Sequence, residues 1–132
     1  MKPFAFVFPG QGSQAVGMLD AWGDHPVVAQ TVREASDALS QDIAVLIRSG
    51  PKEALALTTN TQPVMLVAGV AAYRAWLDHG GAAPSAVAGH SLGEYAALVA
   101  AGVITLAQAA PLVRLRAQAM QDAVPVGNGS MA

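Results

Sequence analysis

The sequence contains no cysteine, which excludes disulfide bonds, a thiolate nucleophile and a thiolate-bound metal site. It also carries little charge: only 12% of its 132 residues are charged, and the net charge is −2. Neither nucleic acid nor an anionic membrane surface is therefore an expected partner. The length suits a single domain, over residues 1–132, that is large enough to bury a sizeable core.

Hydrophobic runs long enough to span a membrane are absent as well, since the longest cover only 63–73 and 95–106. The apolar N-terminal run stops at Pro9-Gly10, too early for a signal peptide, and no cleavage site follows. We expect a cytoplasmic protein that uses neither a cofactor nor a metal. The high apolar content, 53%, indicates either a chain that is mostly core or a surface meant to be covered by further polypeptide.

A G-x-S-x-G pattern at Gly89, Ser91 and Gly93 is the most informative feature. A short strand-like run, 85–88, precedes it and a helix-like run, 94–101, follows it. A strand, a sharp turn and a helix are the context of a nucleophile elbow. The free backbone N–H groups at the start of such a helix can stabilise an oxyanion. Ser91 is therefore a candidate nucleophile.

Apolar periodicity predicts an α/β fold with a parallel sheet core and helices on both of its faces. The expected strands, both buried, are 4–8 and 85–88. The expected helices are 26–39, 43–48, one or two turns within 51–57, 64–79, 94–101 and about 106–123. The helix over 64–79 is apolar nearly all round, so it should be buried on most sides.

Two prolines and one capping motif define the expected helix starts. Pro63 should open the helix that follows the polar loop 58–63. Thr105 and Gln108 fit a capping box, which should start the last helix. Pro111 should bend that helix or move its start.

The glycine-rich loop 9–14 comes directly after the first strand. Two interpretations are open. It is either a turn between strand and helix, or a loop whose backbone approaches a ligand at the carboxyl end of a parallel strand. The loop lacks the Gly-Lys-Ser/Thr ending of a phosphate-binding P-loop.

A serine nucleophile needs a base, and none of the three histidines is well placed. His25 and His79 lie at expected helix ends, where solvated or capping roles are typical. His90 adjoins Ser91, but neighbours on a tight elbow point in different directions, so it is expected to support the turn. No histidine follows Ser91, so the chain cannot supply the order Ser, acid, His of an α/β-hydrolase.

Two arginines lie in the last helix. Helical spacing puts Arg114 on the solvated side and Arg116 at the flank of the apolar face. An inward arginine needs a partner, because an unpaired buried cation is costly. Arg116 is therefore expected either in an internal ion pair or in a site that binds a carboxylate.

Four motifs together resemble the acyltransferase family of malonyl-CoA:acyl carrier protein transacylases and polyketide synthase acyltransferase domains. They are the segments 6–14, 61–63 and 89–95, and Arg116 in its helix with Met and Gln. G-x-S-x-G alone is a weak signal, whereas four motifs in the family's order and spacing are a strong one. The resemblance covers essentially the whole chain.

The resemblance implies that a malonyl group passes from malonyl-CoA to the phosphopantetheine thiol of acyl carrier protein through a malonyl ester on Ser91. The backbone N–H groups of Gln11 and Leu92 would form the oxyanion hole. Arg116 would bind the malonyl carboxylate. The other residues that would line the substrate site are Gln62 and His90. Leu92 also resembles malonyl-selective members, because methylmalonyl-selective domains tend to carry glutamine there.

Family members are more than twice as long as this chain. The resemblance therefore implies a truncated large subdomain, without the catalytic histidine and without the small ferredoxin-like subdomain. The segment 129–132 would lie about where the first strand of that subdomain begins. Strands from the missing part would cover the excess apolar surface.

Two other functions stay open at this stage. A serine esterase or thioesterase would need a downstream Asp and His, and it would have no use for Arg116. A non-catalytic fragment would instead bind coenzyme A, carrier protein or a complementary chain.

We expect this 132-residue chain on its own to turn over little or no malonyl-CoA, because it has no histidine placed to take the proton of Ser91. Incubation with malonyl-CoA followed by intact mass measurement tests this, with Ser91→Ala as the control. Rapid malonylation of Ser91 and onward transfer to carrier protein would contradict it.

Overall fold

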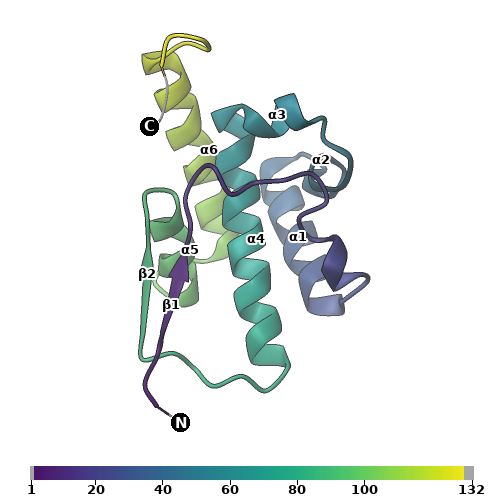
Figure 1. The fold of residues 1–132 in the computed structure, drawn as a ribbon, viewed down its shortest axis with the longest axis vertical. Coiled ribbons are helices and arrows are strands. Elements are labelled where there is room, and N and C mark those ends of the chain that lie inside the picture. Colours follow the sequence, from purple (N-terminus) through teal and green to yellow (C-terminus); the bar gives the residue numbers. More distant parts are fainter. Residues whose placement is uncertain (1, 130–132) are drawn as a thin grey trace.

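One long helix, α4 (Thr58–Asp78), runs through the middle of the molecule, and the other elements pack around it (Figure 1). The computed structural model describes residues 2–129. The elements are, in chain order, β1 (Ala5–Phe8), the 3-10 helix η1 (Asp20–Trp22), α1 (Pro26–Leu39), α2 (Ile43–Ser49), α3 (Lys52–Ala56), α4, β2 (Ala86–Gly89), α5 (Gly93–Ala100) and α6 (Leu106–Ala123). Ser130 to Ala132, the end of the segment expected to lead out of the domain, lie outside the described residues.

Helix α4 is buried because its side chains are apolar on every face, as predicted. Leu66, Val67 and Ala71 are fully buried. Helices α1, α5 and α6 all pack against α4. The core is therefore a group of helices around α4, with the sheet on one side.

The expected start of α4 is wrong: the helix begins at Thr58 rather than after Pro63. Side chains in the first turn hold this early start, since Asn60 Nδ2 donates to the Ala54 carbonyl at 2.9 Å and Thr61 Oγ1 donates to the Leu57 carbonyl at 3.0 Å. Pro63 lies just beyond the first turn, where its missing N–H removes one helical hydrogen bond only. The polar segment is thus the first turn and a half of the helix.

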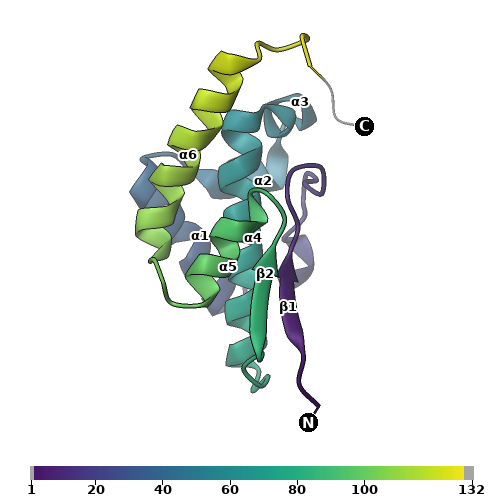
Figure 2. The ribbon, with the colours of Figure 1, turned by 90° about the vertical axis from the view of Figure 1, so that its left-hand side faces the viewer.

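The two strands pair in parallel, with Phe6 opposite Val87 and Phe8 opposite Gly89. One face of this sheet packs on the helices, where the Phe6 ring meets the Tyr73 ring of α4 edge-on at 5.2 Å. The other face is open, and Val7 on it is 70% exposed. The predicted α/β class, with a parallel sheet and flanking helices, is confirmed. Within residues 2–129, however, helices cover only one face of the sheet (Figure 2), so the expectations of helices on both faces and of buried strands are wrong for this part of the chain.

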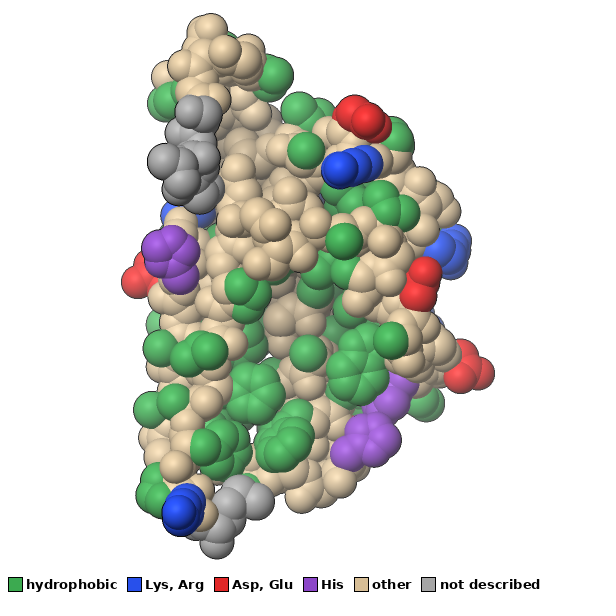
Figure 3. All heavy atoms as spheres, viewed as in Figure 1, with side chains coloured by type: hydrophobic (Ala, Val, Ile, Leu, Met, Phe, Trp, Pro, Cys, Tyr) green, Lys and Arg blue, Asp and Glu red, His purple; other side chains and the backbone are tan. Residues whose placement is uncertain are grey.

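Hydrophobic side chains gather on the lower half of the face where β1 and the C-terminal half of α4 lie (Figure 3). An aromatic cluster joins these two elements: the rings of Phe4 and Phe6 each meet that of Trp76, at 6.1 and 6.2 Å. Trp76 is still 39% exposed. Part of the apolar excess in the composition therefore lies at the surface of the described residues rather than in the core.

Helix α6 begins as predicted. Thr105 Oγ1 accepts from the Gln108 N–H at 3.1 Å, and Gln108 Oε1 accepts from the Thr105 N–H at 3.0 Å, which completes the capping box. The helix runs through Pro111 to Ala123 without interruption. This continuity fixes the register of α6 and with it the direction of Arg116.

Leu66→Ala should lower the free energy of unfolding by about 2–5 kcal/mol, because it leaves a cavity in a closed core. Leu77→Ala on the same helix is the matched control, since Leu77 is 40% exposed, and it should cost less than about 1 kcal/mol. Urea unfolding followed by circular dichroism measures both. Equal losses would show that α4 is not buried as described.

Candidate active site

Ser91 sits on a strained turn between β2 and α5. Its φ is 53°, a left-handed conformation that is uncommon for a residue with a side chain. The flanking glycines make the turn possible. A Cβ on Gly89 would lie 2.0 Å from the Gly93 backbone, and a Cβ on Gly93 would lie 2.1 Å from the Phe8 carbonyl oxygen. The predicted elbow geometry is thus present, with a steric reason for each glycine.

The glycine-rich loop lies directly beside this elbow. A Cβ on Gly10 would lie 2.8 Å from the His90 carbonyl oxygen, so the loop after β1 touches the turn after β2. In the described part of the chain, the backbone N–H groups of Gln11 and Leu92 donate to no protein acceptor. Both N–H groups are therefore free for an oxyanion, as an oxyanion hole requires.

Arg116 of α6 faces Ser91. Its Nη2 donates to Ser91 Oγ at 3.1 Å, and its Nη1 donates to Gln62 Oε1 at 2.5 Å. Its guanidinium carbon lies 5.5 Å from the centre of the Tyr95 ring. No carboxylate lies within 4.0 Å of it among residues 2–129, so the internal ion pair, one of the two expected roles, is wrong. The Arg116 guanidinium thus lies beside Ser91 with N–H groups that make no hydrogen bond to the described residues.

Gln62 joins the site from inside the core, where it is only 1% exposed. Its Nε2 donates to Thr58 Oγ1 at 2.8 Å and lies 3.3 Å from Met120 Sδ. Thr58 Oγ1 in turn donates to Gln11 Oε1 at 2.9 Å. The loop residue Gln11, Thr58 and Gln62 of α4 and Arg116 of α6 therefore form one connected network. Arg116 joins this network to Ser91.

The histidines occupy other positions. His90 is exposed, and no hydrogen bond joins its ring to Ser91 among the described atoms. His25 caps α1, since its Nδ1 accepts from the Val27 N–H at 3.2 Å, and its Nε2 lies 2.9 Å from that of His79. The capping role predicted for His25 is confirmed. Within residues 2–129, none of these rings is placed to take the Ser91 proton.

Arg114 differs from its prediction as a solvated charge. It is half-buried, its Nη2 donates to Gln41 Oε1 at 2.6 Å, and its Nε is buried without a hydrogen-bond partner in the described residues. Burial lowers the pKa of this guanidinium from its ordinary value, because the charged form loses hydration. Arg114 therefore belongs to the packing between α6 and the α1–α2 connection.

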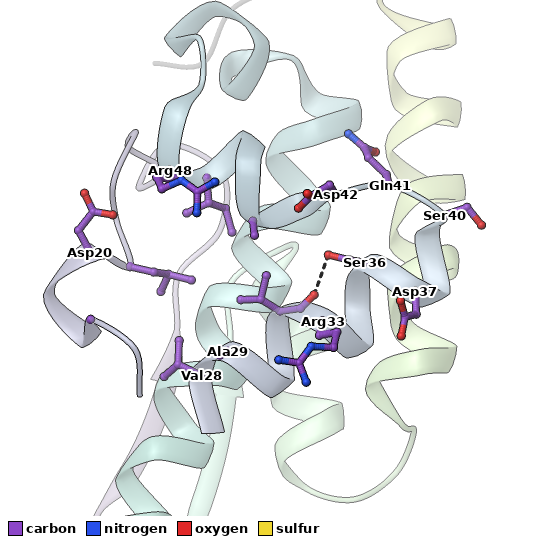
Figure 4. Close-up of a pocket in the computed structure, with 15 residues that line it drawn as sticks. Asp20, Val28, Ala29, Arg33, Ser36, Asp37, Ser40, Gln41, Asp42 and Arg48 are labelled. Carbon is purple, nitrogen blue, oxygen red and sulfur yellow. Dashed lines mark hydrogen bonds between the residues drawn. The ribbon is translucent and has the colours of Figure 1, made fainter. Parts of the chain in front are cut away.

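A cavity of about 1030 Å³ lies away from Ser91, between α1 and α2 (Figure 4). Several polar side chains that line it already make hydrogen bonds to the backbone of α1 and α2. Ser36 Oγ donates to the Val32 carbonyl at 2.8 Å, and Asp42 Oδ1 caps α2 by accepting from the Val45 N–H at 3.2 Å. None of the predicted site residues lines it.

A smaller hollow of about 460 Å³ adjoins the elbow and is lined by Gly89, Glu94 and Tyr95 among others. No group of three or more metal-ligating side chains is found within residues 2–129. None of the helices described there is both long and apolar enough to cross a membrane.

Comparison with known proteins identifies the family. Residues 5–132 match the acyl transferase domain family. This chain belongs to that family. A malonyl CoA-acyl carrier protein transacylase of Escherichia coli O157:H7 is 57% identical over 133 aligned positions, and the alignment covers 100% of this chain and 43% of that protein.

Solved structures agree with this assignment. An acyl-carrier-protein S-malonyltransferase from Burkholderia pseudomallei 1710b is 69% identical with a TM-score of 0.92, over 96% of this chain and 41% of that one. A chain from a structure of a type II PKS acyl-carrier protein in complex with its malonyl-transacylase is 57% identical, with a TM-score of 0.89. The match covers 94% of this chain and 40% of that chain. This acyl transferase chain therefore spans about two fifths of the length of such relatives, and its fold matches that part of them.

Sequence reasoning missed two residues of the site, Thr58 and Tyr95. Thr58 and Gln62 lie four positions apart, so they share one helix face, but only if the helix already includes Thr58. The loop expected over 58–63 hid this signal. Tyr95 was part of the elbow motif, and only the packing of α6 on α5 shows that its ring meets Arg116.

Gly93→Ala should lower the free energy of unfolding by about 3 kcal/mol or more, because backbone atoms of β1 must move to admit the methyl group. Gly102→Ala is the control. Gly102 has no atom near its would-be Cβ, so only its positive φ is strained, at a cost of about 1–2 kcal/mol. Thermal and urea unfolding compare the two variants. A smaller loss for Gly93→Ala would argue against the close approach at the elbow.

Proposed function

We propose that this acyl transferase chain carries the nucleophile and the carboxylate site for transfer of a malonyl group from malonyl-CoA to acyl carrier protein. One observation carries the proposal: the Arg116 guanidinium lies 3.1 Å from Ser91 Oγ and has no carboxylate partner among the described residues. A fixed cation beside the nucleophile favours an acyl group that bears its own carboxylate. Gln62 and His90 are proposed to line the same substrate site.

In the proposed reaction, Ser91 Oγ attacks the thioester carbonyl carbon of malonyl-CoA. The new C–O bond forms while the serine proton passes to a base and the carbonyl electron pair moves onto the carbonyl oxygen. The C–S bond of this tetrahedral intermediate then breaks, and coenzyme A takes that proton and leaves as the thiol. The N–H groups of Gln11 and Leu92 donate to the carbonyl oxygen as its negative charge develops. The carrier thiol then attacks the ester carbonyl carbon and gives its proton to the base. Its new C–S bond replaces the C–O bond to Ser91, whose oxygen takes the proton back.

The resting contact between Arg116 and Ser91 favours the same chemistry. Because the guanidinium only donates, Ser91 Oγ accepts and its own proton stays free for a base. The cation also stabilises negative charge on Oγ. The described residues hold no such base near Ser91. We propose that it comes from polypeptide equivalent to the remaining part of the longer relatives.

The names of relatives support the proposed substrate and partner. They are called malonyl CoA-acyl carrier protein transacylases, and one solved relative is bound to an acyl-carrier protein. We propose the same two partners here, a cytoplasmic role in fatty acid biosynthesis, and no cofactor. A serine esterase is disfavoured, because a neutral acyl group would leave the Arg116 cation unpaired beside it.

The test uses a chimera in which this chain replaces its equivalent in the Burkholderia pseudomallei relative, where 69% identity favours correct packing. Arg116→Ala should lower kcat/KM for malonyl-CoA on the order of 100-fold, the usual effect of removing one partner of a close charge pair. Activity with acetyl-CoA should fall far less. Ser91→Ala should abolish transfer from both donors.

The alternatives give different results in the same chimera. Hydrolysis of neutral acyl esters that Arg116→Ala leaves unchanged would indicate an esterase. Carrier-protein binding without acylation of Ser91, unaltered in Ser91→Ala, would indicate a docking domain. Either result would overturn the proposed transfer.

A further inference from the structure

We propose that Thr58 is a positioning residue: its hydroxyl fixes the amide orientation of Gln62, and through Gln62 the guanidinium of Arg116, while it also holds the Gln11 side chain of the glycine-rich loop. This deepens the proposed function and rests on it for its catalytic meaning. The hydrogen-bond arrangement itself does not depend on which acyl group is transferred.

The four residues form a continuous chain of hydrogen bonds. Arg116 Nη1 donates to Gln62 Oε1 at 2.5 Å, and Gln62 Nε2 donates to Thr58 Oγ1 at 2.8 Å. Thr58 Oγ1 donates to Gln11 Oε1 at 2.9 Å. The chain thus connects the carboxylate-binding cation with the loop that presents an oxyanion-hole N–H.

The directions of the bonds from Arg116 to Gln62 and from Gln62 to Thr58 are determined by the charged end of this network. A guanidinium has five donors and no acceptor, so Gln62 must turn its oxygen toward Arg116. The amide NH₂ then faces Thr58, whose hydroxyl must accept from it. The one hydroxyl proton of Thr58 is left to donate to Gln11 Oε1. Gln62 cannot turn round without placing its NH₂ group against the donors of Arg116.

Burial makes the Thr58 hydroxyl necessary for this arrangement. Gln62 is 1% exposed, so water cannot replace a missing partner of its NH₂ group. Its other neighbour is Met120 Sδ at 3.3 Å, which is a weak acceptor. Without the hydroxyl, the Gln62 NH₂ group loses its hydrogen-bond acceptor, so the amide rotates or shifts toward another one. Gln62 then no longer holds Arg116 in its present direction.

The hydroxyl also ties together two parts of the site that the sequence separates. Gln11 is exposed and lies in a loop, so the bond from Thr58 restrains its side chain against α4. Arg116 comes from α6, at the other end of the network. Thr58 therefore links the position of the glycine-rich loop to the position of Arg116. Among the described residues it makes no hydrogen bond of its own with Ser91 or Arg116.

The first experiment uses the chain itself and does not depend on its function. Nuclear magnetic resonance of the Gln62 side-chain amide should show slow hydrogen exchange in the wild type. Thr58→Val keeps the shape of the side chain and removes the hydroxyl, so it should move the Gln62 amide signals and speed their exchange about tenfold, the usual effect of one lost hydrogen bond. Thr58→Ser keeps the hydroxyl, so it should leave the Gln62 amide signals and their slow exchange close to those of the wild type.

Thr59→Val is the matched control, because Thr59 lies on the same helical turn and its hydroxyl makes no hydrogen bond among the described residues. It should leave the Gln62 amide unchanged. Fast exchange of that amide already in the wild type would overturn the proposed network, and this result needs no variant to fold.

The second experiment measures the affinity of the chain for malonyl-CoA and acetyl-CoA by calorimetry. Thr58→Val should reduce the preference for malonyl-CoA about tenfold, as expected when a charge-assisted contact loses its alignment, and Thr58→Ser should keep the preference within about twofold. A Thr58→Val chain that unfolds at the wild-type temperature and keeps the full preference would overturn the positioning role.

The two experiments separate the failure of this inference from failure of the proposed function. If the wild-type chain shows no preference for malonyl-CoA while the Gln62 amide responds to Thr58→Val as expected, the proposed substrate is wrong and the hydrogen-bond network stands. If malonyl-CoA is preferred and the amide ignores Thr58→Val, the positioning role is wrong and the proposed function stands.

Discussion

The close approach between the start of α5 and the end of β1 is the constraint on which the site depends. A single added methyl group on Gly93 would lie 2.1 Å from the Phe8 carbonyl oxygen, so only glycine permits this contact. The loop after β1 lies against the turn after β2 at the same place, and Ser91 on that turn has a φ of 53°. Parallel strands put both loops at one edge of the sheet, which is where α/β proteins bind ligands. The free N–H groups of Gln11 and Leu92 and the strained Ser91 thus lie together at this edge of the sheet.

The positive charge beside Ser91 comes from Arg116. Arg116 is held by an amide, a hydroxyl and an aromatic ring, all of them neutral. A neutral cradle positions the cation without cancelling its charge, so its attraction for an incoming carboxylate is preserved. Arg114, two residues away, shows the opposite use of the same side chain. Its guanidinium packs against Gln41 and serves the contact between helices.

The sequence predicted most helices within a residue or two, because their apolar spacing, caps and terminal glycines are local signals. It also led to Ser91, Gln11, Leu92, Gln62 and Arg116, which the structure brings to one place. The start of α4 was wrong, because side-chain bonds from Asn60 and Thr61 to the residues before them outweigh the usual role of Pro63. The open outer face at Val7 was also missed, since the apolar run 4–8 is typical of a strand buried on both faces.

The sequence by itself determined the elbow, since its glycines and the strand and helix around it are all encoded within one short stretch. It also determined that the chain offers no histidine after Ser91. Only the tertiary structure showed that Arg116 has no ion-pair partner among the described residues, and only the tertiary structure joined Thr58 to Gln11 across 47 positions. The physical reason is that hydrogen-bond partners distant in sequence are chosen by how helices pack, which local spacing does not encode.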